Sequence, residues 1–208
     1  MPENNEPISL TEDERDCYQE ITNVAMGQAA DRLARLLDVY VVLPIPNVNI
    51  IEISEFNMTL KALEDADSVS AVCQGFIGAG IAGEALLIFN DASLGDIAQL
   101  LKYTGELDQH AELEVLMDVA NVLNGACIQG IGEQLNIPFN QSHPVVLGQH
   151  CNISDLINEK QARWKRTMAI EINYTIEGHN VNCDLILLFT EDSVRHMNVL
   201  ISYLLEDD

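Results

Sequence analysis

The chain contains Leu86-Leu87-Ile88-Phe89 followed by Ser93, and one hundred residues later Ile186-Leu187-Leu188-Phe189 followed by Ser193. Short, bounded apolar runs of this kind are typical of buried strands. Because both the run and the serine behind it return at the same offset, they indicate an internal duplication. We therefore expect two similar halves, each built around a strand of this type.

Each half has the same predicted order of elements: a long helix, a strand region interrupted by prolines, two strands and a shorter helix. Thr11 and Glu14 have the spacing of a capping box, so the first long helix is predicted to begin there. Its apolar residues recur every three or four positions, as on one buried helix face. We expect helices over about 11–38, 92–103, 112–136 and 193–205, and strands over about 39–43, 48–53, 68–76, 84–89, 138–147, 167–176 and 180–189.

The length of 208 residues and the 48% hydrophobic content suit one compact domain with a sizeable core. We predict an α+β fold, in which two α/β halves related by a pseudo-two-fold axis share a β-sheet core and two long helices carry the motif described below. The single domain spans 1–208, with halves at about 10–103 and 109–205. Residues 1–9 are expected to form a flexible N-terminus.

The charge balance excludes one class of partner. The formal net charge is -23, from 33 acidic against 10 basic residues. A phosphate backbone would be repelled by such a surface, so nucleic acid is not an expected partner.

The compartment also follows from the sequence. The N-terminus has neither a basic region nor an apolar signal region, so we expect a cytoplasmic protein. The apolar run 71–89 is broken by Gln74, Glu84 and glycines, which favours a buried hairpin over a membrane span. Five scattered cysteines without a CxxC pair are predicted to be reduced thiols.

One face of the first long helix carries a group of polar residues. At 100° per residue its members fall within a strip about 60° wide, roughly opposite the apolar face. Pro46 follows the last polar member with twenty-two residues between. The strip consists of Asp16, Glu20, Asn23 and Gly27.

The second long helix repeats this arrangement. Its asparagine and the proline that follows are both offset by 98 from those of the first copy, and twenty-two residues again lie between them. The corresponding residues are Glu114, Asp118, Asn121, Gly125 and Pro144. The repeated spacing favours a functional motif over an ordinary solvated helix face.

The first copy resembles the motif of CheC/CheX-type chemotaxis phosphatases: Asp or Ser, three residues, Glu, two residues, Asn, twenty-two residues and Pro. Asp16, Glu20, Asn23 and Pro46 fit it at every position. The second copy keeps the asparagine and the proline but departs at both acidic positions. The resemblance covers essentially the whole chain, since CheC-like proteins carry two such copies in two related halves.

The resemblance implies a phosphatase for the aspartyl-phosphate of a CheY-like response regulator. In the family the motif helix lies on the regulator, its asparagine positions the attacking water, and its glutamate contacts the regulator's lysine. Glu20 and Asn23 would form the stronger site, with Asp118 and Asn121 as the second. A carboxamide suits the asparagine position, because it can hold a water without adding negative charge beside a phosphoryl group.

The same resemblance sets the expected cofactors and partners. The protein would need no cofactor of its own, because the regulator supplies Mg²⁺. The alternative is a non-catalytic binding protein for a response regulator or for a CheD-type receptor deamidase. The sequence names neither the cognate regulator nor the oligomeric state.

Other features have simpler interpretations. Gly78, Gly80 and Gly83 have the spacing of a dinucleotide fingerprint, but a strand follows them instead of a helix. The spacing of His143, His150 and Cys151 matches no common zinc site, and their segment is expected to be a loop. For the mid-helix glycines of the motif we expect another backbone nearby, because glycine inside a helix costs about 1 kcal/mol relative to alanine.

Overall fold

The computed structural model describes residues 7–52, 54–56, 58, 68–152 and 166–206. The first long helix, α1, begins at Glu12 and ends at Leu37. Thr11 and Glu14 form the predicted capping box, and Asp38 ends the helix in the left-handed conformation. The second long helix, α4, begins three residues earlier than predicted and spans Gln109–Leu135, because the Asp108 side chain caps the amide of Ala111.

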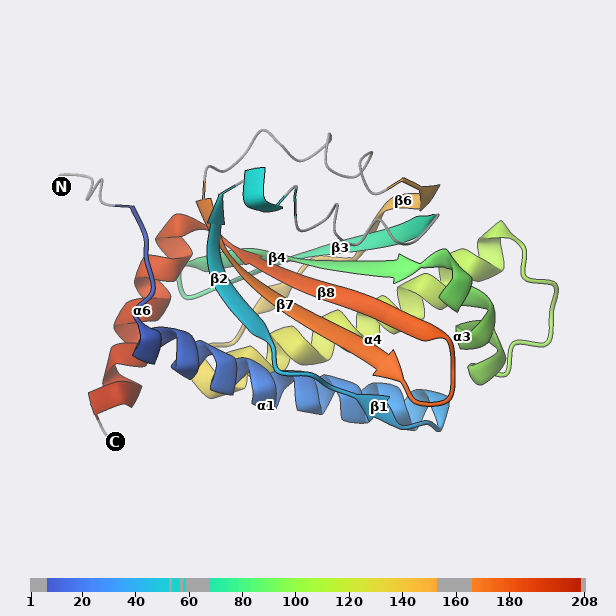
Figure 1. Cartoon of the computed structure of the whole chain (residues 1–208), viewed down its shortest axis with the longest axis horizontal. Helices are drawn as coiled ribbons and strands as arrows, with labels where there is room; N and C mark the ends of the chain where they lie inside the picture. Colours follow the sequence, from blue (N-terminus) through green and yellow to red (C-terminus); the bar gives the residue numbers. More distant parts are fainter. Residues whose placement is uncertain (1–6, 53, 57, 59–67, 153–165, 207–208) are drawn as a thin grey trace.

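The described strands form an eight-stranded antiparallel sheet in the order β1-β7-β8-β4-β3-β5, with β2 also on β7 and β6 also on β3 (Figure 1). Their bounds are β1 Val41–Val42, β2 Asn47–Glu52, β3 Val69–Gly78, β4 Ile81–Asn90, β5 Asn140–Gln141, β6 Val145–Cys151, β7 Arg166–Ile176 and β8 Val181–Phe189. The short helices are η1 Asp91–Ser93, α3 Leu94–Leu100 and α6 Glu191–Glu206. The α+β class predicted from the sequence is confirmed.

The predicted duplication is visible in the centre of the sheet. Leu86 of β4 pairs with Ile186 of β8, so equivalent residues of the two halves face each other across the pseudo-two-fold axis. The repeated serines also join the halves. The Ser93 hydroxyl accepts a hydrogen bond from the amide of Asn182, and the Ser193 hydroxyl accepts one from the amide of Ala82.

The edge strands are exchanged between the halves. Strand β2 of the first half pairs with β7 of the second, while β6 of the second half pairs with β3 of the first. Each half therefore completes the sheet of the other. The sequence predicts the strands but not their partners.

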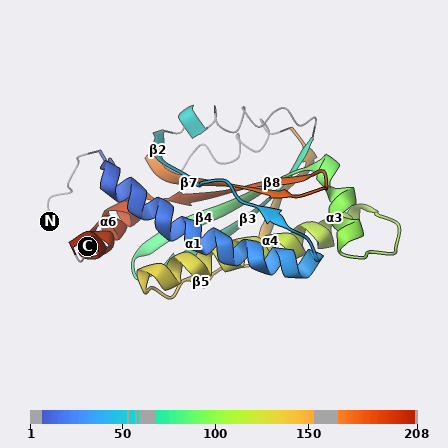
Figure 2. The same cartoon turned by 60° about the horizontal axis from the view of Figure 1, so that its bottom comes forward.

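Helices α1 and α4 run antiparallel across one face of the sheet, with α6 and α3 at opposite ends (Figures 1 and 2). One continuous apolar cluster fills the space between helices and sheet. The two long helices approach closely at Gly130, where an added Cβ would lie 2.8 Å from the Ala25 Cα. A small residue is required there because the two backbones nearly touch.

Three sequence expectations need correction or comment. The flexible N-terminus was placed too far along the chain, because Ile8 is buried in the core; residues 1–6 lie outside the described part. His150 and Cys151 belong to β6 and not to a loop. The apolar run 71–89 forms the β3–β4 hairpin as predicted.

By length and composition alone, α4 is apolar enough to cross a membrane. Most of its apolar window is buried against α1 and the sheet, as in the core helix of a globular fold. One buried helix of this kind is weak evidence for a membrane span.

Candidate functional site

The polar strip of α1 is exposed. Asp16, Glu20 and Asn23 all lie at the surface, while Tyr18 and Ile21 on the other face are buried. The tertiary fold therefore covers the apolar face and leaves the strip open. Within the described residues, neither Glu20 nor Asn23 has a side-chain hydrogen bond, so both are available to a partner.

Tyr18 anchors this part of α1. Its hydroxyl donates a 2.6 Å hydrogen bond to the Asn198 Oδ1 of α6, and burial raises its pKa far above the usual range. The phenol therefore stays protonated and serves as a donor at any physiological pH. The bond fixes α1 against α6 within one turn of Glu20.

Pro46 lies beside the strip despite its distance along the chain. It is buried, and its carbonyl accepts a 3.1 Å hydrogen bond from the Gln19 Nε2. The chain rises about 27 Å along α1 from Gln19 to Leu37. The eight residues from Val39 to Pro46, in extended conformation, can return about 26 Å. The fixed spacing between asparagine and proline thus brings the proline back to the level of the strip.

The second strip is exposed in the same way. Glu114, Asp118 and Asn121 lie at the surface of α4, and Pro144 is half-buried. Here Met117 occupies the position of Gln19, so the helix has no equivalent donor for the proline carbonyl.

The predicted role of the motif glycines is wrong. An added Cβ at Gly27 would meet nothing within 4 Å, and at Gly125 it would meet only the Gln141 side chain at 3.7 Å. The close backbone approach occurs at Gly130 instead. The sequence did not reveal this, because the helix crossing depends on how α1 and α4 pack.

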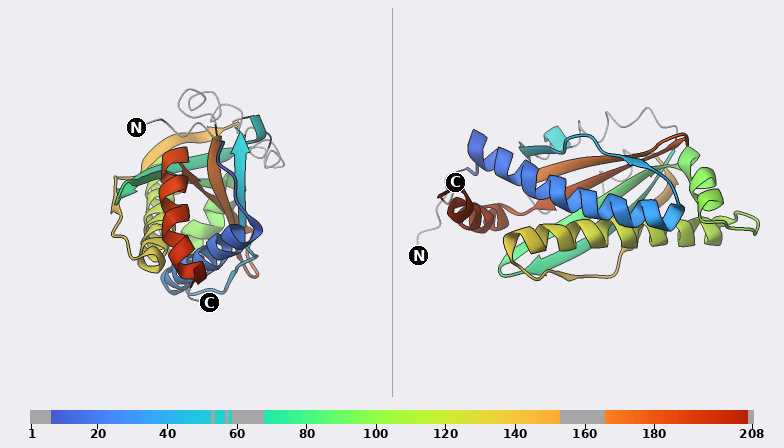
Figure 3. Two further views of the ribbon diagram at one scale, coloured as in Figure 1. Left: turned by 90° about the vertical axis from the view of Figure 1, so that its left-hand side faces the viewer. Right: turned by 90° about the horizontal axis from the view of Figure 1, so that it is seen from below.

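The two strips lie at opposite ends of the helix pair. Helix α1 begins next to α6, whereas α4 begins next to α3 at the other end of the molecule (Figure 3). The ten motif residues are therefore brought together as two separate groups of five. One partner docked at the start of α1 would leave the start of α4 uncovered.

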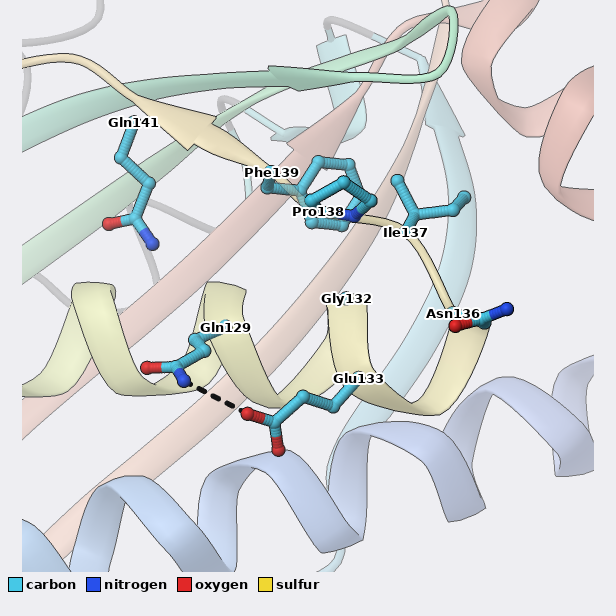
Figure 4. Close-up of a pocket in the computed structure, with 8 residues that line it drawn as sticks. All are labelled: Gln129, Gly132, Glu133, Asn136, Ile137, Pro138, Phe139 and Gln141. Carbon is cyan, nitrogen blue, oxygen red and sulfur yellow. Dashed lines mark hydrogen bonds between the residues drawn. The ribbon is translucent and has the colours of Figure 1, made fainter.

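An open hollow of about 530 Å³ lies between α4 and residues 136–141 (Figure 4). Its lining residues are Gln129, Gly132, Glu133, Asn136, Ile137, Pro138, Phe139 and Gln141. None of them belongs to the motif. The hollow adjoins the C-terminal end of α4, away from Asp118 and Asn121 of the second strip.

Sequence reasoning missed a polar cluster near the start of α4. His150 Nδ1 lies 3.0 Å from an Asp91 carboxylate oxygen, and its Nε2 lies 2.7 Å from Glu112. The hydrogen bond to Glu112, supported by Asp91, raises the pKa of His150 despite an opposing effect of burial. No sequence spacing signals this cluster, because its members come from β6, η1 and α4.

No cluster of three or more histidine, cysteine or acidic side chains suited to a metal ion occurs among the described residues. The prediction that the protein needs no cofactor of its own stays a prediction.

The exposed strips, the central duplication and the exchanged edge strands define a two-copy α+β protein with one motif helix in each half. No protein-family model and no curated protein matches the chain. Three solved structures with the same fold are FliY from Thermotoga maritima, the FliM middle domain from Vibrio alginolyticus, and CheX from Borrelia burgdorferi in a complex with CheY, BeF₃ and Mg²⁺. The chain therefore has the CheC/CheX-type fold, which confirms the resemblance at the level of the fold.

The similarity is extensive in space and low in sequence. FliY has a TM-score of 0.68 at 22% identity, with 94% of this chain and 99% of FliY covered. The FliM domain has a TM-score of 0.60 at 12% identity, with 88% and 99% covered. CheX has a TM-score of 0.54 at 14% identity, with 84% of this chain and 98% of CheX covered.

Proposed function

We propose that the protein is a cytoplasmic phosphatase that docks the start of α1 on a CheY-like response regulator and accelerates hydrolysis of its aspartyl-phosphate. The observation that carries this proposal is the exposed strip with Glu20 and Asn23 on a CheC/CheX-type fold. The complex of a CheX with CheY and BeF₃ supports the choice of partner, because it shows that a protein of this fold binds such a regulator.

In the proposed reaction, water attacks the phosphorus atom, the bond between phosphorus and the aspartate oxygen breaks, and inorganic phosphate leaves. The Asn23 carboxamide holds the water in line through one donated and one accepted hydrogen bond. Such positioning is the main requirement of phosphoryl transfer, because the regulator and its Mg²⁺ already neutralise the phosphoryl charge.

Glu20 has the complementary role. Its carboxylate lies one turn before Asn23 on the same face, so the two side chains reach neighbouring points on a partner. A lysine of the regulator would form a charge-assisted hydrogen bond with Glu20 and fix the docking register. Asp118 of the second strip is shorter than Glu by one carbon–carbon bond, about 1.5 Å, and would reach such a lysine less well.

The alternative is binding without hydrolysis, to a regulator or to a CheD-type deamidase. The second strip favours this alternative for its own half, because Asp118 replaces the usual glutamate.

The decisive experiment measures phosphate release from a panel of phosphorylated regulators, with and without the protein. We expect Asn23→Ala to slow the accelerated reaction about a hundredfold or more, as loss of a water-positioning group can. Binding to a BeF₃-loaded regulator should change far less. Asn180→Ala removes an exposed carboxamide from the β7–β8 turn, which lies near the C-terminal end of α1, and is the matched control. Tight binding without any acceleration would reject the phosphatase and establish the alternative.

A further inference from the structure

The segments that carry the two motif prolines are attached in different ways. In the first half, β1 pairs with β7 up to Val42 and Thr175, and pairing resumes at Asn47 and Glu171. Within the described part of the chain, no backbone hydrogen bond joins residues 43–46 to β7. The segment Leu43–Pro46 therefore leaves the sheet edge.

The second half keeps this segment on the sheet. Ser142 donates its amide to the Gly75 carbonyl at 2.8 Å, and its hydroxyl accepts the Gly75 amide at 3.0 Å. Gln74 adds a 2.9 Å hydrogen bond to the Ser142 carbonyl. These three bonds hold the segment before Pro144 against β3.

One residue explains much of this difference. Pro44 occupies the position of Ser142, and a proline has neither an amide hydrogen nor a hydroxyl to offer the sheet. A cavity of about 200 Å³ lies between Pro44, Ile45 and the outer face of β7 and β8, where the segment has moved away. The segment needs another attachment.

Gln19 supplies that attachment. Its side-chain amide bonds the Pro46 carbonyl, whereas Met117, its equivalent in α4, has no donor. Prolines at 44 and 46 hold Leu43 and Ile45 in extended conformations, so the segment is stiff and one bond can set its position. Ile45, which is 82% exposed, belongs to this stiff segment.

We propose that Gln19 is a positioning residue of the first site, and that the Leu43–Pro46 segment it holds forms one edge of the surface on which the regulator docks. The inference rests on the proposed function and goes beyond the motif, because Gln19 is outside the four-residue pattern. It acts on affinity for the regulator, since Gln19 is half-buried and bonded to the protein itself, away from the reacting atoms.

The test uses Gln19→Met, which copies the second half, and Gln19→Glu, which keeps the length but cannot donate a hydrogen bond. Both are expected to raise the KM for the phosphorylated regulator about fivefold, the scale of one lost hydrogen bond, with kcat within twofold of the unchanged protein. Gln28→Met makes the same substitution at a side chain that bonds Glu133 of α4, and should leave KM unchanged.

The outcomes separate the two proposals. A normal KM in both Gln19 variants, with Asn23→Ala inactive as expected, would overturn the positioning role and leave the phosphatase intact. A fall in kcat at constant KM would also reject it, because that result assigns Gln19 to the chemical step. Failure of the unchanged protein to accelerate any regulator would overturn both.

Discussion

The first half attaches its proline segment to the motif helix through Gln19, whereas the second half attaches it to the sheet through Ser142. The interior of the two halves differs far less, because β4 and β8 pair through equivalent residues and Ser93 and Ser193 make equivalent bonds. A core residue must fit both halves at once, whereas each proline segment at the surface is held by a single helix or strand. The duplicated copies can therefore specialise at the surface without losing the shared core.

The comparison predicts its largest effect at the two asparagines. Asn23→Ala should lower phosphate release about a hundredfold, whereas Asn121→Ala should lower it less than about twofold, because the second helix lacks the usual glutamate. The measurement is single-turnover release from one phosphorylated regulator. Retained activity in Asn23→Ala with loss in Asn121→Ala would reverse the ranking of the halves.

The second prediction concerns stability at the helix crossing. Gly130→Ala should lower the free energy of unfolding by about 1–3 kcal/mol, since its Cβ would press on the Ala25 backbone. The Cβ added by Gly27→Ala would have no atom within 4 Å. This substitution should therefore raise the free energy of unfolding by up to about 1 kcal/mol, because alanine favours a helix more than glycine does. Urea unfolding of both variants measures the two values. Equal effects would mean that α1 and α4 do not approach closely at Gly130.

A smaller change is expected at Asp118. With the first site silenced by Asn23→Ala, Asp118→Glu should raise the remaining phosphate release about threefold, because the longer carboxylate recovers the reach to a regulator lysine. The same assay at saturating regulator measures it. An unchanged or lower rate would indicate that the second helix serves another partner.

The smallest effect is a pH dependence confined to the second half. Glu112 and Asp91 are the charged groups that contact His150, and they raise its pKa above 6.5 in the folded protein. The contacts of His150 with these carboxylates therefore stabilise the fold fully below about pH 6.5, which is the pKa of His150 in the unfolded chain. This stabilisation is lost as the pH rises through the higher pKa of His150 in the folded protein. The position equivalent to His150 in the first half holds Glu52, which forms an ion pair with Arg166.

The measurement for this prediction is the melting temperature between pH 5.5 and 9. His150→Gln should flatten the part of the profile above pH 6.5. The side chain is 45% exposed, so the change should be a few degrees at most. If the unchanged protein and His150→Gln had the same dependence of melting temperature on pH, His150 would not be the source of that dependence.

The sequence predicted the parts of the molecule that depend on periodicity and repetition. The capped helix at Thr11, the exposed strip and the central strands all follow from local spacing. The exchange of β2 and β6 could not be predicted, because either strand has a pattern that fits either hairpin. Gln19 was missed for a related reason: Met117 replaces it in the second copy, so the repeat gave it no emphasis.

The exchanged edge strands also affect how the protein is made. Asn47 of β2 is 124 positions before its partner Glu171 of β7. At about 5–20 residues per second, a ribosome needs roughly 6–25 s to complete that interval. During this time the nascent chain presents β2 without its partner strand, as an edge that other chains can pair with. The interval between β2 and β7 is therefore a period in which the chain can mispair before its sheet is complete.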